Sequence, residues 1–221
     1  MRYNVLDWMA DESFERYLRL VGESGALKSI NAGRHWMLYQ LLRLTEKVPG
    51  DTAECGVYLG ASSYLICSFI ARSSLVKSHH MFDSFEGLSA PTPQESIYWS
   101  EHDLQIDFND TARLLSQFKD IHYYVGWIPN RFNEIADRQF SFLHIDVDLY
   151  EPTRDSIAFF YPRMSAGAVI LCDDYGSSTC PGATKAMDEY LQDKPEKMVM
   201  LSDGGGFLIK GTPTSDAYRS A

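Results

Sequence analysis

The fold class is decided by the stretch Thr52-Ala53-Glu54-Cys55-Gly56-Val57-Tyr58-Leu59-Gly60. Its apolar residues 52–57 predict a short strand, and the two glycines predict a tight turn. Residues 62–71 continue with helix-like spacing, and the turn signal Pro49-Gly50-Asp51 precedes the strand. A strand that passes through a glycine turn into a helix is typical of an α/β protein.

Strand-like and helix-like stretches alternate along the rest of the chain. Further strands are predicted at 79–82, 121–125, 140–145, 167–172, 197–201 and 206–210, and further helices at 110–118, 153–161 and 183–191. This alternation predicts a mostly parallel seven-stranded sheet with helices on both faces. Residues 1–47 have helical spacing and predict an N-terminal helical cap on one side of that sheet.

We therefore expect three segments: a helical cap at 1–47, an α/β domain at 48–210 and a tail at 211–221. A chain of 221 residues fits one domain with a sizeable core. The 87–109 stretch is an inserted loop with two prolines, and loops of this length are usually functional or disordered. Two roles stay open for its Tyr98 and Trp99: a lid over a bound molecule, or an anchor for the loop or a dimer contact.

A formal net charge of −10 argues against nucleic acid and anionic membranes as partners, because both attract basic surfaces. No apolar run is long enough to cross a bilayer, and the start of the chain does not resemble a signal peptide, so we expect a cytoplasmic protein. The cysteines lack paired metal-ligand spacing, which predicts reduced, structural thiols. They are Cys55, Cys67, Cys172 and Cys180.

The glycine turn is a candidate ligand site, because ligands of open α/β sheets bind beyond the carboxyl ends of the strands. Its spacing differs from the G-x-G-x-x-G of dinucleotide folds. Glu54 would repel a pyrophosphate but tolerate a cationic or amino-bearing ligand. Asp83, at the end of the next predicted strand, occupies the position where ribose hydroxyls are bound. A tight turn without a ligand is the alternative interpretation.

Four carboxylates follow two apolar strands: Asp146 and Asp148 come after 140–145, and Asp173 and Asp174 come after 168–172. Parallel neighbours would bring them to one edge of the sheet, where they would repel each other. A divalent cation such as Mg²⁺ resolves that repulsion, provided that the chain turns after Asp173. The alternative is that some of these acids cap helices, for which Thr153 is the better candidate. His144, inside the apolar strand, is expected to be a core residue.

Six motifs follow one another along the chain: Pro49-Gly50-Asp51, Glu54-x-Gly56-Val57-x-x-Gly60, Asp83-Ser84-Phe85-Glu86-Gly87-Leu88, Gly126-Trp127, Asp146-x-Asp148-Leu149-Tyr150-Glu151-x-Thr153 and Asp173-Asp174-Tyr175-Gly176. Taken together, over about residues 29–210, they resemble those of the macrocin O-methyltransferase (TylF-like) family.

The resemblance implies a Rossmann-like class I methyltransferase fold, S-adenosylmethionine (SAM), Mg²⁺, and methylation of a sugar hydroxyl of a natural product. Asp146, Asp173 and Asp174 resemble the metal ligands of the family, and Asp148 resembles its general base. The partner expected is a small hydroxyl-bearing acceptor, not a nucleic acid or membrane, and a homo-oligomer is compatible. The predicted SAM contacts are Ser29, Glu54, Gly56, Gly60, Ser62, Ser63, Asp83, Ser84, Trp127 and Asp146.

Three other classes of protein share part of this pattern of residues. Phosphatases of the haloacid-dehalogenase type have Asp-x-Asp early in the chain, whereas here it comes late, after a glycine turn. Metal-dependent glycosyltransferases use Asp-x-Asp to hold a nucleotide diphosphate, and basic residues near the phosphates would be expected. A non-catalytic SAM-binding protein would not need the cluster of acids.

Overall fold

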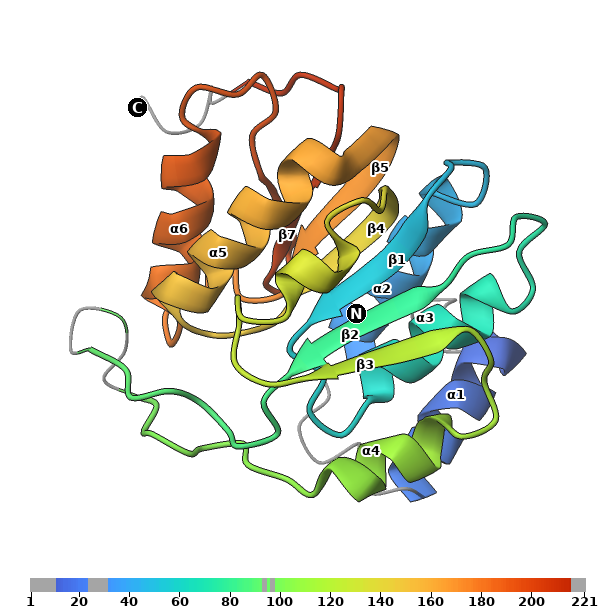
Figure 1. Ribbon diagram of the computed structural model, residues 1–221. Coiled ribbons are helices and arrows are strands. Elements are labelled where there is room, and N and C mark those ends of the chain that lie inside the picture. The colour runs from blue at the N-terminus through green and yellow to red at the C-terminus, as the bar shows by residue number, and fades with distance from the viewer. Residues whose placement is uncertain (1–10, 24–31, 93–94, 96–97, 216–221) are drawn as a thin grey trace, which may run out of the picture.

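The computed structural model describes residues 11–23, 32–92, 95 and 98–215. Ser29, one of the predicted SAM contacts, lies outside the described residues. Figure 1 shows a central sheet with helices packed on both of its faces. The strand order is β3-β2-β1-β4-β5-β7-β6. The strands are β1 (Asp51–Cys55), β2 (His79–Asp83), β3 (Ile121–Val125), β4 (Phe140–Ile145), β5 (Met164–Cys172), β6 (Val199–Met200) and β7 (Gly206–Ile209).

Strands β1 to β5 pair in parallel, and β7 is antiparallel to both β5 and β6. The predicted mostly parallel seven-stranded α/β sheet is therefore confirmed. The hairpin from β6 to β7 passes through Gly204 and Gly205, both of which have positive φ. Glycine adopts this backbone conformation without the steric cost that a side chain would add.

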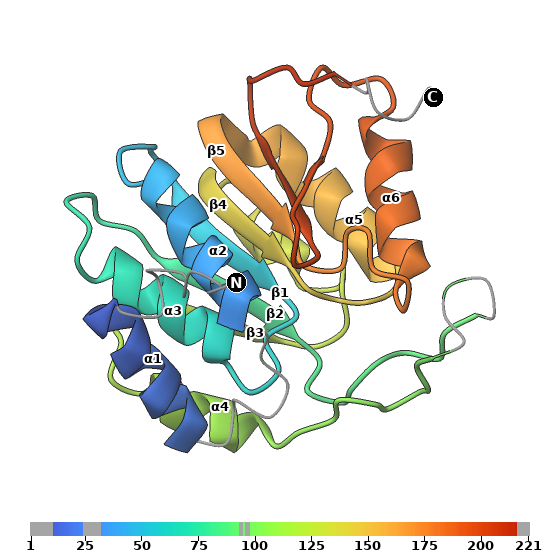
Figure 2. The ribbon, with the colours of Figure 1, turned by 180° about the vertical axis from the view of Figure 1, so that it is seen from behind.

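The helices form two layers. They are α1 (Glu12–Glu23), α2 (Ala32–Leu44), α3 (Ala61–Ile70), α4 (Phe108–Leu115), α5 (Tyr150–Phe160) and α6 (Pro181–Leu191), with short 3₁₀ turns at Phe132–Ile135 and Tyr161–Arg163. In Figure 1, α5 and α6 lie in front of the sheet. Figure 2 shows α2 and α3 on the opposite face.

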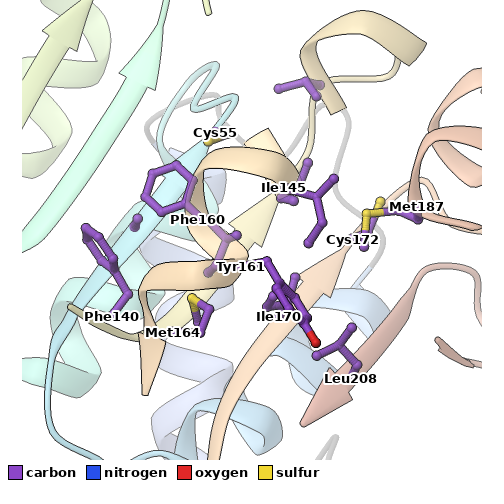
Figure 3. Close-up of a cluster of buried hydrophobic side chains, with 14 of the residues drawn as sticks. Cys55, Phe140, Ile145, Phe160, Tyr161, Met164, Ile170, Cys172, Met187 and Leu208 are labelled. Carbon is purple, nitrogen blue, oxygen red and sulfur yellow. The ribbon is translucent and has the colours of Figure 1, made fainter. Parts of the chain in front are cut away.

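Each face of the sheet buries its own apolar cluster. Leu143 and Ile145 pack in the cluster under α5 and α6, whereas Phe142 packs in the cluster with α1 to α4. This division follows from the alternation of side chains along a strand. Figure 3 shows the first cluster, with Phe140 and Phe160 among its labelled side chains. Burying one such side chain fully stabilises the fold by roughly 1.5–3 kcal/mol.

The order of the strands leaves a crevice between β1 and β4. The chain leaves β1 for α3 on one face and leaves β4 for α5 on the other, which is the arrangement where α/β sheets bind ligands. The two main chains are in close contact there, because the amide of Asp146 donates to the carbonyl of Cys55 over 2.8 Å. A Cβ on Gly56 would lie 1.7 Å from the carbonyl oxygen of Asp146, so this position requires glycine.

The expected role of Thr153 as a helix cap is wrong. Helix α5 already begins at Tyr150, and the Thr153 hydroxyl donates to the carbonyl of Leu149 from inside the helix over 2.7 Å. The side chain that serves this helix start comes from the inserted loop: Glu95 Oε1 accepts from the amide of Tyr150 over 3.2 Å. A sequence pattern cannot reveal a cap that lies so far away in the chain.

None of the helices within the described residues is both long and apolar enough to cross a bilayer. The four cysteines are free and buried, as predicted. The division into a cap, a domain and a tail stays a prediction.

Candidate functional site

A cavity of about 600 Å³ opens at the carboxyl ends of β1, β2, β4 and β5. Its lining combines the glycine turn, the end of β2, the segment after β3 and the carboxylates after β4 and β5. The predicted site residues that line it are Gly56, Asp83, Ser84, Trp127, Asp146, Asp148, Asp173 and Asp174. The structure thus brings most of the predicted site together in one cavity.

Asp83 ties the glycine turn to the end of β2. Its Oδ2 accepts from the amides of Val57 and Tyr58 over 2.7 and 2.9 Å, and its Oδ1 accepts from the amide of Phe85 over 2.7 Å. A carboxylate has about four lone-pair sites, so these three bonds leave capacity for a ligand hydroxyl. Asp83 therefore both shapes the turn and presents an acceptor to the cavity.

Trp127 supplies an aromatic surface to the same part of the cavity. Its side chain follows β3, lines the cavity beside Ile128 and remains 36% exposed. A half-exposed indole next to a hydroxyl-accepting carboxylate suits the two halves of a nucleoside, a flat base and a ribose. Neither group makes a site alone, but here they share one wall.

The carboxylates after β4 and β5 converge. One oxygen each from Asp146, Asp173 and Asp174 lie within 4.8 Å of one another, and Asp174 forms a second such group with Asp148 and Cys180. Strand β5 ends at Cys172, and the chain turns over the next residues, so Asp173 and Asp174 can both face the cavity. The turn on which the metal prediction depended is present.

Burial raises the pKa values of Asp146 and Asp174, and repulsion from neighbouring carboxylates adds to the effect. The pKa of Asp174 rises to about 8 through burial and the neighbouring Asp148 and Asp173. The pKa of Asp146 lies well above its usual range for the same reasons, with burial as the largest cause. These carboxyl groups ionise with difficulty unless a positive charge lies nearby. Their oxygens are hard ligands, so the set fits a divalent cation such as Mg²⁺.

Asp148 reaches the cluster by an unexpected route. Strand β4 ends at Ile145, so the strand periodicity that suggested convergence with Asp146 does not extend this far. Asp148 instead has a positive φ of 58°, and its amide donates to Asp174 Oδ2 over 3.0 Å. The thiol of Cys180 donates to its Oδ1 over 3.4 Å. Burial raises the pKa of Asp148 to about 6.

Four predicted SAM contacts do not line this cavity: Glu54, Gly60, Ser62 and Ser63. Glu54 is fully buried inside the sheet, where it accepts hydrogen bonds from Ser63 and, over 2.8 Å, from His144 Nδ1. The position of Glu54 next to the turn suggested exposure to a ligand, but its side chain points under α3. Gly60 has a positive φ at the start of that helix, and Ser62 and Ser63 are buried within it.

The sequence did not identify Arg34 and Cys180 as residues of the site, and it left the role of Trp99 open. Arg34 lines the cavity and forms an ion pair with Asp173. Trp99 also lines it, and its indole N–H donates to Cys180 Sγ over 3.2 Å, whereas Tyr98 is 65% exposed. No local signal in the sequence marks Arg34 or Cys180, because the partners of each lie far away in the chain.

Comparisons with known proteins point to one family of enzymes. A model of the macrocin-O-methyltransferase (TylF) family matches residues 37–201. Among curated proteins, the chain is 28% identical over 158 residues to the demethyldecarbamoylnovobiocin O-methyltransferase of Streptomyces niveus, with 65% of this chain and 58% of the relative covered. It is 24% identical over 197 residues to the mycinamicin III 3''-O-methyltransferase of Micromonospora griseorubida, with 82% and 74% covered.

A third relative is the 8-demethyl-8-(2,3-dimethoxy-α-L-rhamnosyl)-tetracenomycin-C 4'-O-methyltransferase of Streptomyces olivaceus, 25% identical over 152 residues, with 63% of this chain covered. The matches span 58% of the length of this relative and of the one from Streptomyces niveus.

Two solved structures share the fold. The O-methyltransferase NovP superposes with a TM-score of 0.71 at 23% identity, covering 82% of this chain and 81% of that one. CalS11, a calicheamicin methyltransferase, superposes with a TM-score of 0.74 at 16% identity, covering 91% and 94%. The sheet and its helices therefore have the Rossmann-like fold of class I methyltransferases.

Proposed function

The chain belongs to the macrocin O-methyltransferase (TylF) family, and from that premise we propose that it transfers a methyl group from SAM to a hydroxyl group with the help of a divalent metal. The acceptor is a sugar or related polyol of a natural product. The curated relatives support this substrate class, because one is named for a rhamnosyl compound. We also propose that residues 48–210 form the catalytic domain and that the helices before them cap it.

SAM binds in the half of the cavity that is formed by the glycine turn, Asp83 and Trp127. Asp83 would accept the ribose hydroxyls, and the indole of Trp127 would contact the adenine. Gly56 and Asp146 line the same cavity, and Asp146 would hold the ammonium group of the methionine end. Ser84 completes this half of the site.

Asp146, Asp173 and Asp174, whose carboxylate oxygens converge, would hold the metal, most simply Mg²⁺. When bound there, the metal lowers the pKa of a coordinated hydroxyl and offsets the charge of the carboxylates. These residues fit the ion because their oxygens are hard ligands, are already close together, and lack enough positive partners of their own.

Asp148 is the general base. With SAM and acceptor bound, Asp148 would take the proton that the acceptor hydroxyl loses on methylation, and S-adenosylhomocysteine would be the leaving group. The pKa of Asp148, about 6, keeps it ionised near neutral pH. Its backbone is fixed by the bond to Asp174, and its carboxylate is oriented by the thiol of Cys180. Enclosure in the cavity keeps acceptor and base close together, which reduces the entropic part of the barrier.

One observation carries the proposal: Asp83 and Trp127, which suit a nucleoside, line the same cavity as the carboxylates. The same cavity disfavours a nucleotide-diphosphate donor. Among the described residues that line it, Arg34 is the one positively charged side chain, and it is already paired with Asp173. A diphosphate would meet mainly carboxylates there, which is electrostatically unfavourable.

Isothermal titration calorimetry tests the proposal with SAM, with S-adenosylhomocysteine and with a UDP-sugar, each with and without Mg²⁺. We expect SAM and S-adenosylhomocysteine to bind and the UDP-sugar to give no heat. Binding of the UDP-sugar that depends on Mg²⁺ would instead support a glycosyltransferase. Binding of SAM by a protein with no affinity for any divalent cation would contradict the metal-dependent mechanism.

A further inference from the structure

Arg34 enters the cavity from the first turn of α2. Its Nη1 donates to Asp173 Oδ2 over 2.6 Å, and its Nε donates to the carbonyl of Asp203 over 3.1 Å. The side chains of Arg34 and Asp173 are 26% and 20% exposed, so this ion pair is largely shielded from water. It joins α2 to the end of β5 and to the hairpin between β6 and β7.

The hairpin is shaped to receive this guanidinium group. A Cβ on Gly204 would lie 2.4 Å from Arg34 Nη2 and 3.1 Å from its Nε. The same glycine has a φ of +91°. The glycines before β7 therefore do more than turn the chain, because any side chain at position 204 would displace Arg34 from its place beside Asp173.

The positive charge of Arg34 acts on the same carboxylates that would bind a metal ion. It faces Asp146, Asp173 and Asp174, the same three carboxyl groups whose oxygens converge. Of these three, Asp173 is the carboxylate that Arg34 bonds. A cation bound by all three would share Asp173 with the guanidinium group and would be repelled by it.

We propose that Arg34 is a built-in counter-cation of the carboxylate cluster and competes with the divalent metal for Asp173. Metal binding then loosens Arg34 from Asp173 and from the hairpin. This role rests on the proposed metal-dependent function and deepens it, because it makes the affinity for metal depend on a residue of α2. An arginine that instead orients Asp173 as a ligand would have the opposite effect, since removing such outer partners weakens metal binding 10–100-fold.

Calorimetric titration of the metal-free full chain with Mg²⁺ or Mn²⁺ alone distinguishes the two roles by sign. For Arg34→Met we expect affinity to rise about tenfold or more, because a repelling positive charge is removed. Arg34→Lys, which keeps the charge, should stay within about threefold of the wild type, since the repulsion is retained. Arg43→Met is the matched control, because Arg43 is an exposed residue of the same helix that donates to Gln40 and does not line the cavity.

Tighter binding cannot result from a damaged fold, which would weaken the site. If the wild type binds metal and Arg34→Met binds it equally or more weakly, the role of Arg34 is overturned and the proposed function is left intact. A wild type that binds neither Mg²⁺ nor Mn²⁺ would overturn both.

A second pair of variants moves Arg34 without removing its charge. Gly204→Ala should displace the guanidinium group and raise the affinity for metal. Gly211→Ala is the control for backbone strain, because Gly211 has a similar φ of +84° and nothing within 4 Å of an added Cβ. Equal affinities in these two variants would contradict the packing of Arg34 on Gly204.

Discussion

The molecule buries carboxylates in two places, and their pKa values are shifted in opposite directions. Inside the sheet, burial alone would raise the pKa of Glu54, but a hydrogen bond from His144 and the nearby His79 hold it well below its usual range. At the rim of the cavity, burial and mutual repulsion raise the pKa values of Asp146, Asp148 and Asp174.

The difference lies in the partners. Glu54 has its hydrogen-bonding partners, Ser63 and His144, within the fold, so its charge is a structural feature. Among the described residues that line the cavity, Arg34 is the one Lys or Arg side chain, and it is paired with Asp173, so the rim favours a cation or a proton from outside. A buried acid with internal partners stabilises a fold, whereas buried acids without them indicate a functional site.

Asp148→Asn should give the largest effect on activity and would sharpen the contrast. We expect turnover to fall about 10²–10⁴-fold, because the general base is lost, while SAM binding and the melting temperature stay close to the wild type. Methyl transfer and calorimetry with SAM measure the two effects. Asp137→Asn, on the exposed surface, is the control. Full activity of Asp148→Asn would remove this residue from the role of base.

Glu54→Gln should act on the fold instead. We expect the free energy of unfolding to fall by about 3–5 kcal/mol, because the substitution leaves His144 and His79 without their charged partner. Urea denaturation measures it, with the exposed Glu46→Gln as the control, which should stay within about 0.5 kcal/mol of the wild type. A loss below about 1 kcal/mol would mean that Glu54 is not a structural charge, and the comparison would fail.

The stability of the metal-free protein should fall as pH rises from about 6.5 to 8. The folded-state pKa of Asp174 is about 8, above the unfolded value, so this carboxyl group binds its proton more tightly in the folded state. Below this window His35 opposes the trend, because burial lowers its pKa to about 4. We expect a loss of about 1–3 kcal/mol that added Mg²⁺ suppresses. Urea denaturation in EDTA at several pH values measures it, and Asp174→Asn should flatten the slope. Stability that does not change across this window would show that the rim carries no unfavourable charge.

Trp99→Phe should give the smallest effect. It removes the donor to Cys180, whose thiol orients Asp148, but keeps an aromatic ring in the cavity wall. We expect the KM for the acceptor to rise about fivefold, which corresponds to one hydrogen bond of about 1 kcal/mol, with SAM affinity unchanged. Steady-state kinetics measures it, with Tyr98→Phe as the exposed control. Equal KM values in both variants would show that the hydrogen bond from Trp99 does not affect binding of the acceptor.

The sequence predicted the sheet well because its strands are short apolar runs between clear turn signals. The strands predicted at 121–125 and 140–145 match β3 and β4. It also predicted the convergence of Asp146, Asp173 and Asp174, since parallel strands end at one edge.

The rest depends on the direction of side chains and on distant contacts. Glu54 was expected beside the ligand, but its side chain points into the sheet, toward His144. The partner of Arg34 lies 139 residues away in the chain, so no local pattern relates the two. The position of Asp148 depends on its left-handed backbone, which strand periodicity does not anticipate.

The contact between Gly56 and the Asp146 carbonyl has a consequence for engineering. The floor of the cavity at this point is made by two main chains in contact, and no residue larger than glycine fits. Redesign for a new acceptor should therefore leave Gly56 and its contact with the main chain of Asp146 unchanged. Changes belong elsewhere in the lining, where Trp99 and Leu104 come from the inserted loop and Thr179 precedes α6.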